Sequence, residues 1–92
     1  MNELVLISVV GTDEPGITAV ITRLLGQQDV DILDIGQSVI HDHLFLGILV
    51  NIPGDAASLK TAIDRTVSDF MVGVRVAPVT EQSSDTWVEL QG

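Results

Sequence analysis

The chain has 92 residues, 46% of them hydrophobic, and its 13 acidic side chains against four basic ones give a formal net charge of −9. This length predicts one small domain with a single core. The charge repels phosphate backbones and anionic lipids, which argues against nucleic acid and membranes as partners. The absence of cysteine excludes a disulfide framework, a thiolate zinc site and a thiol nucleophile.

The N-terminal segment does not resemble a secretion signal. Met1–Glu3 lacks a basic region before the apolar run that follows, and no apolar stretch approaches the roughly 20 residues that span a bilayer. We therefore expect a soluble, cytoplasmic protein.

The first half of the chain predicts a strand, a helix and a second strand. Leu4–Val10 is an apolar strand. A helix follows, ended by Gly26-Gln27-Gln28, because apolar residues recur at helical spacing at Ile17, Val20, Ile21, Leu24 and Leu25. Val30–His41 is then a strand whose two faces alternate, with Ile35, Gln37, Val39 and His41 on one and Asp34, Gly36, Ser38 and Ile40 on the other.

The second half repeats this pattern after a hairpin turn expected at Asp42-His43. Leu44–Ile52 is a third strand, closed by Pro53-Gly54, and Asp55 is a suitable N-cap for a second helix. That helix has its apolar positions at Leu59, Ile63, Val67 and Phe70, and a last strand follows with Val72, Val74, Val76 and Val79.

The element order βαββαβ predicts an α+β fold, the ferredoxin-like sandwich. Two right-handed βαβ halves interleave into a four-stranded antiparallel sheet with both helices on one face. Strands one and three are central in this topology, and they are also the runs that are apolar almost without alternation. The domain is expected to span residues 1–79.

The first strand is apolar on both faces, since Val5, Ile7 and Val9 alternate with Leu4, Leu6 and Val10. A sheet covered on one face only would alternate apolar with polar residues. We therefore expect another copy of the domain, or a neighbouring domain, to cover the second face. Residues 80–92 begin with a polar run and are expected to form a linker or tail, interrupted by Trp87, Val88 and Leu90.

The loop Gly11-Thr12-Asp13-Glu14-Pro15-Gly16 lies between the first strand and the first helix. Free N–H groups and the positive dipole end of a helix favour a carboxylate or phosphate there, and glycine allows close approach. Proline and glycine are also ordinary helix-start residues that need no ligand. Neither a G-x-G-x-x-G fingerprint nor a Gly-Lys-Ser/Thr P-loop is present, which argues against nucleotide binding.

The sequence offers little support for catalysis or a metal site. The two histidines, His41 and His43, flank the predicted hairpin and do not obviously activate Ser8, Ser38 or Thr12. No third ligand at a recognisable spacing accompanies His41-x-His43. Asp29, Asp31 and Asp34 form a carboxylate cluster that suits a hard cation, but solvated loop and edge residues explain it better.

The segments Asp13-x-Pro15-Gly16-Ile17 and Val30-Asp31-Ile32 resemble the signature of the ACT domain, a small-molecule-sensing module, over Glu3 to about Pro78. Asp34–His41 with Leu44-Phe45-Leu46-Gly47 is similar to the N-terminal ACT domain of bacterial phosphoserine phosphatases. That resemblance implies a regulatory or assembly domain of a serine-biosynthetic enzyme. The Asp-x-Asp-x-Thr-type motif of the phosphatase domain is absent from these 92 residues, so no catalytic residue is carried over, and Mg²⁺ is expected only in a catalytic domain.

The resemblance also implies where a ligand would bind. In amino-acid-binding ACT domains it lies at a dimer interface, between the strand-to-helix loop of one copy and the start of the second strand of another. The N–H groups of the helix start can hold a carboxylate, and an aspartate can accept from an ammonium group. The implied residues here are Gly11, Thr12, Asp13, Pro15, Gly16, Ile17, Thr18 and Asp31.

Asp31 departs from the family pattern, since binding members often carry asparagine there. The leading hypothesis is a non-catalytic module that binds a small amino acid such as serine and acts through a homodimer and a catalytic domain of the same chain. One alternative is a purely structural dimerisation or domain-positioning module without ligand. Another, from the enzyme class, is a metal-assisted hydrolytic site formed by His41 and the aspartates.

Overall fold

The predicted βαββαβ order is confirmed in a computed structural model that describes residues 3–79. The expected tail and its Trp87 lie outside the described residues. In chain order the elements are β1 (Glu3–Thr12), α1 (Ile17–Gln27), β2 (Asp31–Ile40), β3 (His43–Ile52), α2 (Ala56–Thr66) and β4 (Val72–Pro78).

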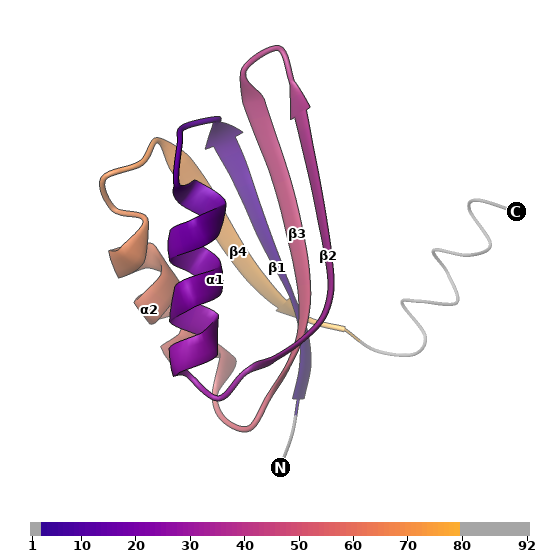
Figure 1. Cartoon of the computed structure of the whole chain (residues 1–92). Helices are drawn as coiled ribbons and strands as arrows, with labels where there is room; N and C mark the ends of the chain where they lie inside the picture. The colour runs from indigo at the N-terminus through magenta and orange to yellow at the C-terminus, as the bar shows by residue number, and fades with distance from the viewer. Residues whose placement is uncertain (1–2, 80–92) are drawn as a thin grey trace, which may run out of the picture.

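The four strands form one antiparallel sheet in the order β2-β3-β1-β4. Both helices lie on the same face of this sheet (Figure 1). The two strands that are apolar on both faces, β1 and β3, occupy the centre as predicted. β2 is an edge strand, and all ten of its residues are exposed.

The core lies between the sheet and the helices. β1 contributes alternate residues from Val5 to Val9, and each helix contributes one apolar stripe. Fourteen hydrophobic side chains are buried: Val5, Ile7, Val9, Ile17, Ile21, Leu25, Leu44, Leu46, Ile48, Val50, Ile52, Leu59, Ile63 and Val67. Phe70, expected on the second helix, lies beyond the end of α2 but still packs partly against this core.

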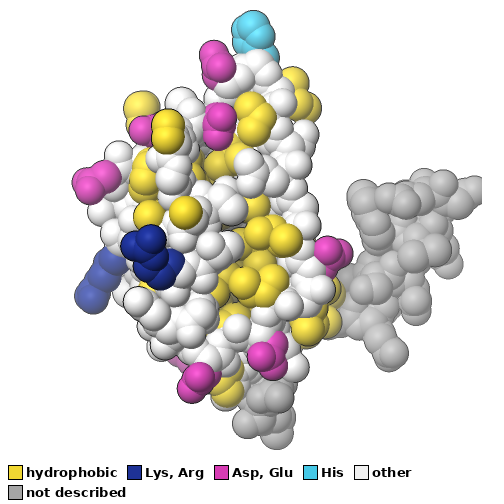
Figure 2. Space-filling view, viewed as in Figure 1, with side chains coloured by type: hydrophobic (Ala, Val, Ile, Leu, Met, Phe, Trp, Pro, Cys, Tyr) yellow, Lys and Arg dark blue, Asp and Glu magenta, His cyan; other side chains and the backbone are white. Residues whose placement is uncertain are grey.

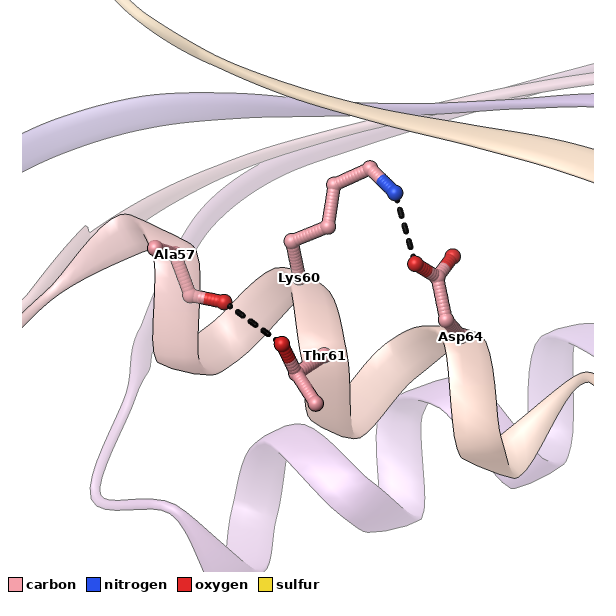
Figure 3. A network of polar contacts seen from close by, with 4 residues as sticks. All are labelled: Ala57, Lys60, Thr61 and Asp64. Carbon is pink, nitrogen blue, oxygen red and sulfur yellow. Dashed lines mark hydrogen bonds and ion pairs between the residues drawn. The ribbon is translucent and has the colours of Figure 1, made fainter.

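The two helices begin in different ways. The Asp55 carboxylate caps α2 as predicted, accepting a hydrogen bond of 3.0 Å from the Ala57 N–H. α1 begins after Pro15, at Ile17, and its N-cap residue Gly16 adopts φ 90° without a side-chain cap. Along α2, Lys60 and Asp64 form an ion pair of 2.6 Å, and the Thr61 hydroxyl donates to the Ala57 carbonyl (Figure 3).

The hairpin between β2 and β3 differs by one residue from the predicted turn. Ile40 pairs with His43, so the turn residues are His41 and Asp42, and His43 already belongs to β3. Both turn residues have positive φ, 49° and 70°, as a two-residue type I′ turn requires. β2 also contains a bulge between Ile32 and Asp34, which disturbs the simple alternation expected for this strand.

The second face of the sheet is apolar at its centre, as the pattern of β1 predicted. The side chains of Leu6, Val10 and Phe45 are 39%, 47% and 43% exposed on that face. We call the face of the sheet that lies away from the helices the open face.

Candidate functional site

The predicted ligand loop between β1 and α1 is anchored to two neighbouring turns. The Asp13 N–H donates to the Asp42 carbonyl at 2.9 Å, which ties the loop to the β2–β3 turn. The Thr12 N–H donates to the Met71 carbonyl at 3.0 Å, and the Met71 N–H donates to the Glu14 carboxylate at 2.9 Å. The loop is therefore held on both sides by segments distant in sequence.

Gly11 has a packing role at this end of the sheet. A Cβ placed there would lie 2.3 Å from the Met71 carbonyl oxygen and 2.6 Å from the Val72 Cα, far inside van der Waals contact. The absence of a side chain at Gly11 is thus required by the close approach of the chain where β4 begins.

Gly16 opens the start of α1 to solvent. Its φ of 90° is a left-handed conformation that residues with side chains rarely adopt, and no atom of the described residues lies within 4 Å of the position of a Cβ. The Ile17 N–H makes a long bond of 3.4 Å to the Glu14 carbonyl, whereas the Gly16 and Thr18 N–H groups have no acceptor among residues 3–79. These two donors can take an external anion.

Thr18 links this helix start to β2. Its hydroxyl donates to the Gln37 side-chain carbonyl at 2.9 Å. Gln37 lies between Ile35 and Val39, which are 44% and 47% exposed on the side of β2 that faces α1. Figure 2 shows hydrophobic side chains gathered in this region, between α1 and the β2–β3 edge of the sheet.

Asp31 lies far from the loop within one chain. It is the first residue of β2 and pairs with Asn51, whereas Thr12 pairs with His43 at the opposite end of the sheet. Ten strand residues span about 33 Å. The structure therefore brings Gly11, Thr12, Asp13, Pro15, Gly16, Ile17 and Thr18 together in one region, and it leaves Asp31 apart from them.

A hollow of about 190 Å³ lies near the end of the sheet where β3 ends and α2 begins. It is half-open to solvent, and none of the predicted ligand residues lines it. Its walls come from Gln28, Val30, Ile52, Pro53, Gly54, Asp55, Ser58 and Leu59. No local sequence pattern indicates this hollow, because the Pro-Gly turn and the α2 cap approach the end of α1 only in the folded chain.

The histidines and aspartates considered for chemistry are spread along the exposed surface. His43 Nδ1 lies 3.2 Å from the His41 carbonyl oxygen, a local contact within the hairpin. Asp29, Asp31 and Asp34 are all exposed, and no three His, Cys, Asp or Glu side chains converge within residues 3–79. In the same residues, no helix is long and apolar enough to cross a membrane.

Two functional candidates were missing from the sequence prediction, Glu14 and Gln37. Glu14 lies inside the predicted loop, but its role as an acceptor depends on Met71, which is 57 positions away. Gln37 is a polar residue on the helix-facing side of β2. Its place on that otherwise apolar side is the only feature of the sequence that could have marked it as a site residue.

Comparison with known proteins identifies the family. The sequence profile of the ACT domain matches residues 3–77. The chain is 40% identical over 81 residues to the phosphoserine phosphatase SerB2 of Mycobacterium tuberculosis, covering 88% of this chain and 20% of that protein. It is 36% identical over 77 residues to the protein MMP0657 of Methanococcus maripaludis, covering 80% of this chain and 86% of that one.

Solved structures share the fold. An ACT domain protein from Streptococcus pneumoniae superposes with a TM-score of 0.73 at 22% identity, covering 83% of this chain and 89% of that one. A putative glycine cleavage system transcriptional repressor superposes with a TM-score of 0.76 at 21% identity, covering 87% and 47%. The profile match and the relatives together show that this chain belongs to the ACT domain family.

Proposed function

We propose that this chain is a regulatory module that binds a small amino acid, with serine as the first candidate, between two copies of the domain. ACT membership supports a regulatory role. The choice of serine rests on the relative named as a phosphoserine phosphatase, because hydrolysis of phosphoserine releases serine.

The observation that carries the proposal is the open start of α1. Gly16 takes the N-cap position with φ 90° and presents no side chain, so the N–H groups of Gly16 and Thr18 are free to bind a carboxylate. The first turn of α1 contains no acidic residue that would compete with such an anion. The neighbouring Gln37 amide, oriented by Thr18, offers further donors.

A second copy supplies the other half of this site. Asp31 is too far along β2 to reach the loop of its own chain, but β2 is an edge strand whose outer side has no partner strand among residues 3–79. Antiparallel pairing of two β2 edges places the start of one strand beside the end of the other. The end of β2 leads into the turn whose Asp42 carbonyl binds the loop, so Asp31 of the partner subunit would lie near the ligand's ammonium group.

The same arrangement covers the apolar side chains of Ile35 and Val39, which one copy leaves exposed. A ligand that bridges two copies binds the dimer more tightly than the separate copies, and this difference in binding free energy favours the dimer. In allosteric systems generally the difference is on the order of 1–3 kcal/mol. Binding would thus be transmitted as a change in assembly.

For the protein context, we propose a link to serine biosynthesis. The chain spans a fifth of the phosphatase it resembles but most of a small archaeal relative, so the domain occurs in both settings. If a phosphatase domain accompanies this module, any Mg²⁺ belongs to that domain and not to the residues described here.

Amide NMR titration of the chain with L-serine, glycine and L-phosphoserine tests the ligand site. We expect saturable shifts at Gly11–Thr18 and around Asp31 with serine. Gly16→Val should abolish them while leaving the fold, because a β-branched residue is strained at φ 90° and its side chain would occupy the open space at the start of α1 where the ligand is proposed to bind. Gly26→Val is the matched control, since nothing lies within 4 Å of its Cβ position and it is remote from the loop.

Unchanged spectra at millimolar concentrations of all three ligands would contradict the proposal. They would favour a second function, a structural module that assembles proteins without ligand, for which the apolar open face is the supporting observation. Light scattering with and without serine separates the two, because a purely structural dimer has the same mass in both.

A further inference from the structure

The open face carries an ordered pattern of side chains across all four strands. Cross-strand partners share a face and lie side by side, so the pairing of the strands arranges the face in rows. The middle row consists of small residues and one cation: Gly36, Gly47, Ser8 and Arg75, from β2, β3, β1 and β4.

An apolar pair lies on each side of this row. On one side the row is Ser38, Phe45, Val10 and Gly73, and on the other it is Asp34, Leu49, Leu6 and Ala77. The face thus has two apolar ridges over β1 and β3 that flank a shallow middle. No atom of the described chain lies within 4 Å of a Cβ at Gly36 or Gly47, so the middle is unfilled.

The charges of the open face are divided between its two edges. Arg75 lies at the β4 edge, while Asp31 and Asp34 lie at the β2 edge. Arg75 makes no ion pair within the described range 3–79. The other cations are on the helices: Arg23 on α1, and Lys60 and Arg65 on α2.

We propose that the open face binds the open face of a second copy, about a two-fold axis that runs parallel to the strands between β1 and β3. This axis lays β3 over β1 of the partner and β2 over β4 of the partner. Phe45 then packs on Val10 of the partner subunit, and Leu49 packs on Leu6 of the partner subunit. Aligned packing of two sheets is a common arrangement.

The charges select this axis. It sets Arg75 over Gly36 of the partner subunit, where no side chain obstructs it, and one row from Asp34 of the partner subunit. An axis perpendicular to the strands would instead set the two Arg75 side chains against each other. Opposite charges across an interface determine orientation, and like charges brought together are repelled.

The size of the face suits weak self-association. Three strands of ten residues and one of seven have a footprint of about 600 Å² per copy, or about 1,200 Å² for two copies, at the lower end of specific interfaces. We therefore expect a dimer that forms over the micromolar range. β2 contributes to both this surface and the proposed ligand site, but the free amides of the ligand site lie at the start of α1, on the other side of the sheet from the open face.

Sedimentation equilibrium of the whole 92-residue chain without amino acids tests the interface by charge reversal. Arg75→Asp and Asp34→Arg should each weaken dimerisation about tenfold, and the double variant should return to within a few-fold of the wild type. Arg23→Asp and Asp69→Arg are matched controls for net charge, because these residues are exposed and lie outside the open face.

Phe45→Ser provides an independent check that does not change charge. Phe45 is 43% exposed in one copy, so the variant should remain folded by circular dichroism while its dimer dissociates. A wild-type chain that stays monomeric into the millimolar range would overturn the proposal. So would an effect of Arg75→Asp no larger than that of Arg23→Asp, or a double variant that is not restored. If serine causes no shifts in the NMR spectrum but the charge-reversal variants dimerise as expected, only the proposed ligand function is overturned.

Discussion

The Glu14 carboxylate accepts a hydrogen bond of 2.9 Å from the Met71 N–H, joining the β1–α1 loop to the turn before β4 across 57 sequence positions. The Thr12 N–H donates to the carbonyl of the same Met71, so both backbone groups of one residue bind the loop. This contact holds the proposed ligand loop in place without any contribution from the ligand.

Replacing Glu14 with alanine should destabilise the domain by about 1 kcal/mol, because the Met71 N–H loses a charged acceptor. Glu14→Gln should lose less, since its side-chain carbonyl still accepts. Urea unfolding followed by circular dichroism measures both. Equal losses for the two variants would contradict the assigned hydrogen bond.

Gly11→Ala should destabilise the fold by about 2–3 kcal/mol, because its Cβ would overlap the Met71 carbonyl and the Val72 backbone. Gly47→Ala is the matched control. It also lies in a central strand, but nothing is within 4 Å of its Cβ position, and its free energy of unfolding should hardly change. Thermal unfolding of the two variants compares them directly, and similar midpoints would disprove the close approach.

Asp42→Gly should stabilise the domain by about 1 kcal/mol. Asp42 has φ 70° in a two-residue turn, where glycine adopts this conformation without steric cost. Asp69→Gly serves as the comparison, because this turn residue has no positive φ and should lose stability through the greater freedom of the unfolded chain. The denaturant concentrations at the unfolding midpoint measure the difference in stability between the two variants, provided that the dependence of the free energy of unfolding on denaturant is unchanged. Stabilisation by both substitutions would refute the turn assignment.

Thr18→Val should weaken serine binding about fivefold, because the Gln37 amide loses the hydroxyl that orients it. The stability of the domain should change little, since the Thr18–Gln37 hydrogen bond is exposed. Thr18→Ser retains the hydroxyl and should bind nearly as the wild type does. Isothermal titration calorimetry gives both dissociation constants. Wild-type affinity in Thr18→Val would place the ligand elsewhere.

The elements and their order followed from periodicity alone. The helical spacing from Ile17 to Leu25 and the apolar runs of β1 and β3 reflect which side chains must leave water, and burial is decided largely by local pattern. Asp55 was also predictable as a cap, because its acceptor role needs only its own helix. The His41–Asp42 turn was misplaced by one residue because strand register depends on pairing between strands.

The candidate site was predictable only in part. The loop from Gly11 to Thr18 stood out by its glycines and its place between strand and helix, which are local signals. Gly11 was predicted as part of the ligand loop, and that role stays a prediction; its packing against Met71 and Val72 was not predictable from the sequence. The partners of Glu14 and Thr18 could not be found in advance, since both contacts join residues of separate elements.

The sequence by itself determined the α+β fold, the faces of the core and the existence of an apolar second face, because these depend on the residue types that alternate along each segment. Only the tertiary structure decided which residues share a row of the open face. It placed Arg75 in the same row as Gly36, and Asp34 in the next row of the same strand as Gly36. It also separated Asp31 from the loop. Those relationships arise from register between strands that are not consecutive in the chain, and register is set by the packing of the whole sheet.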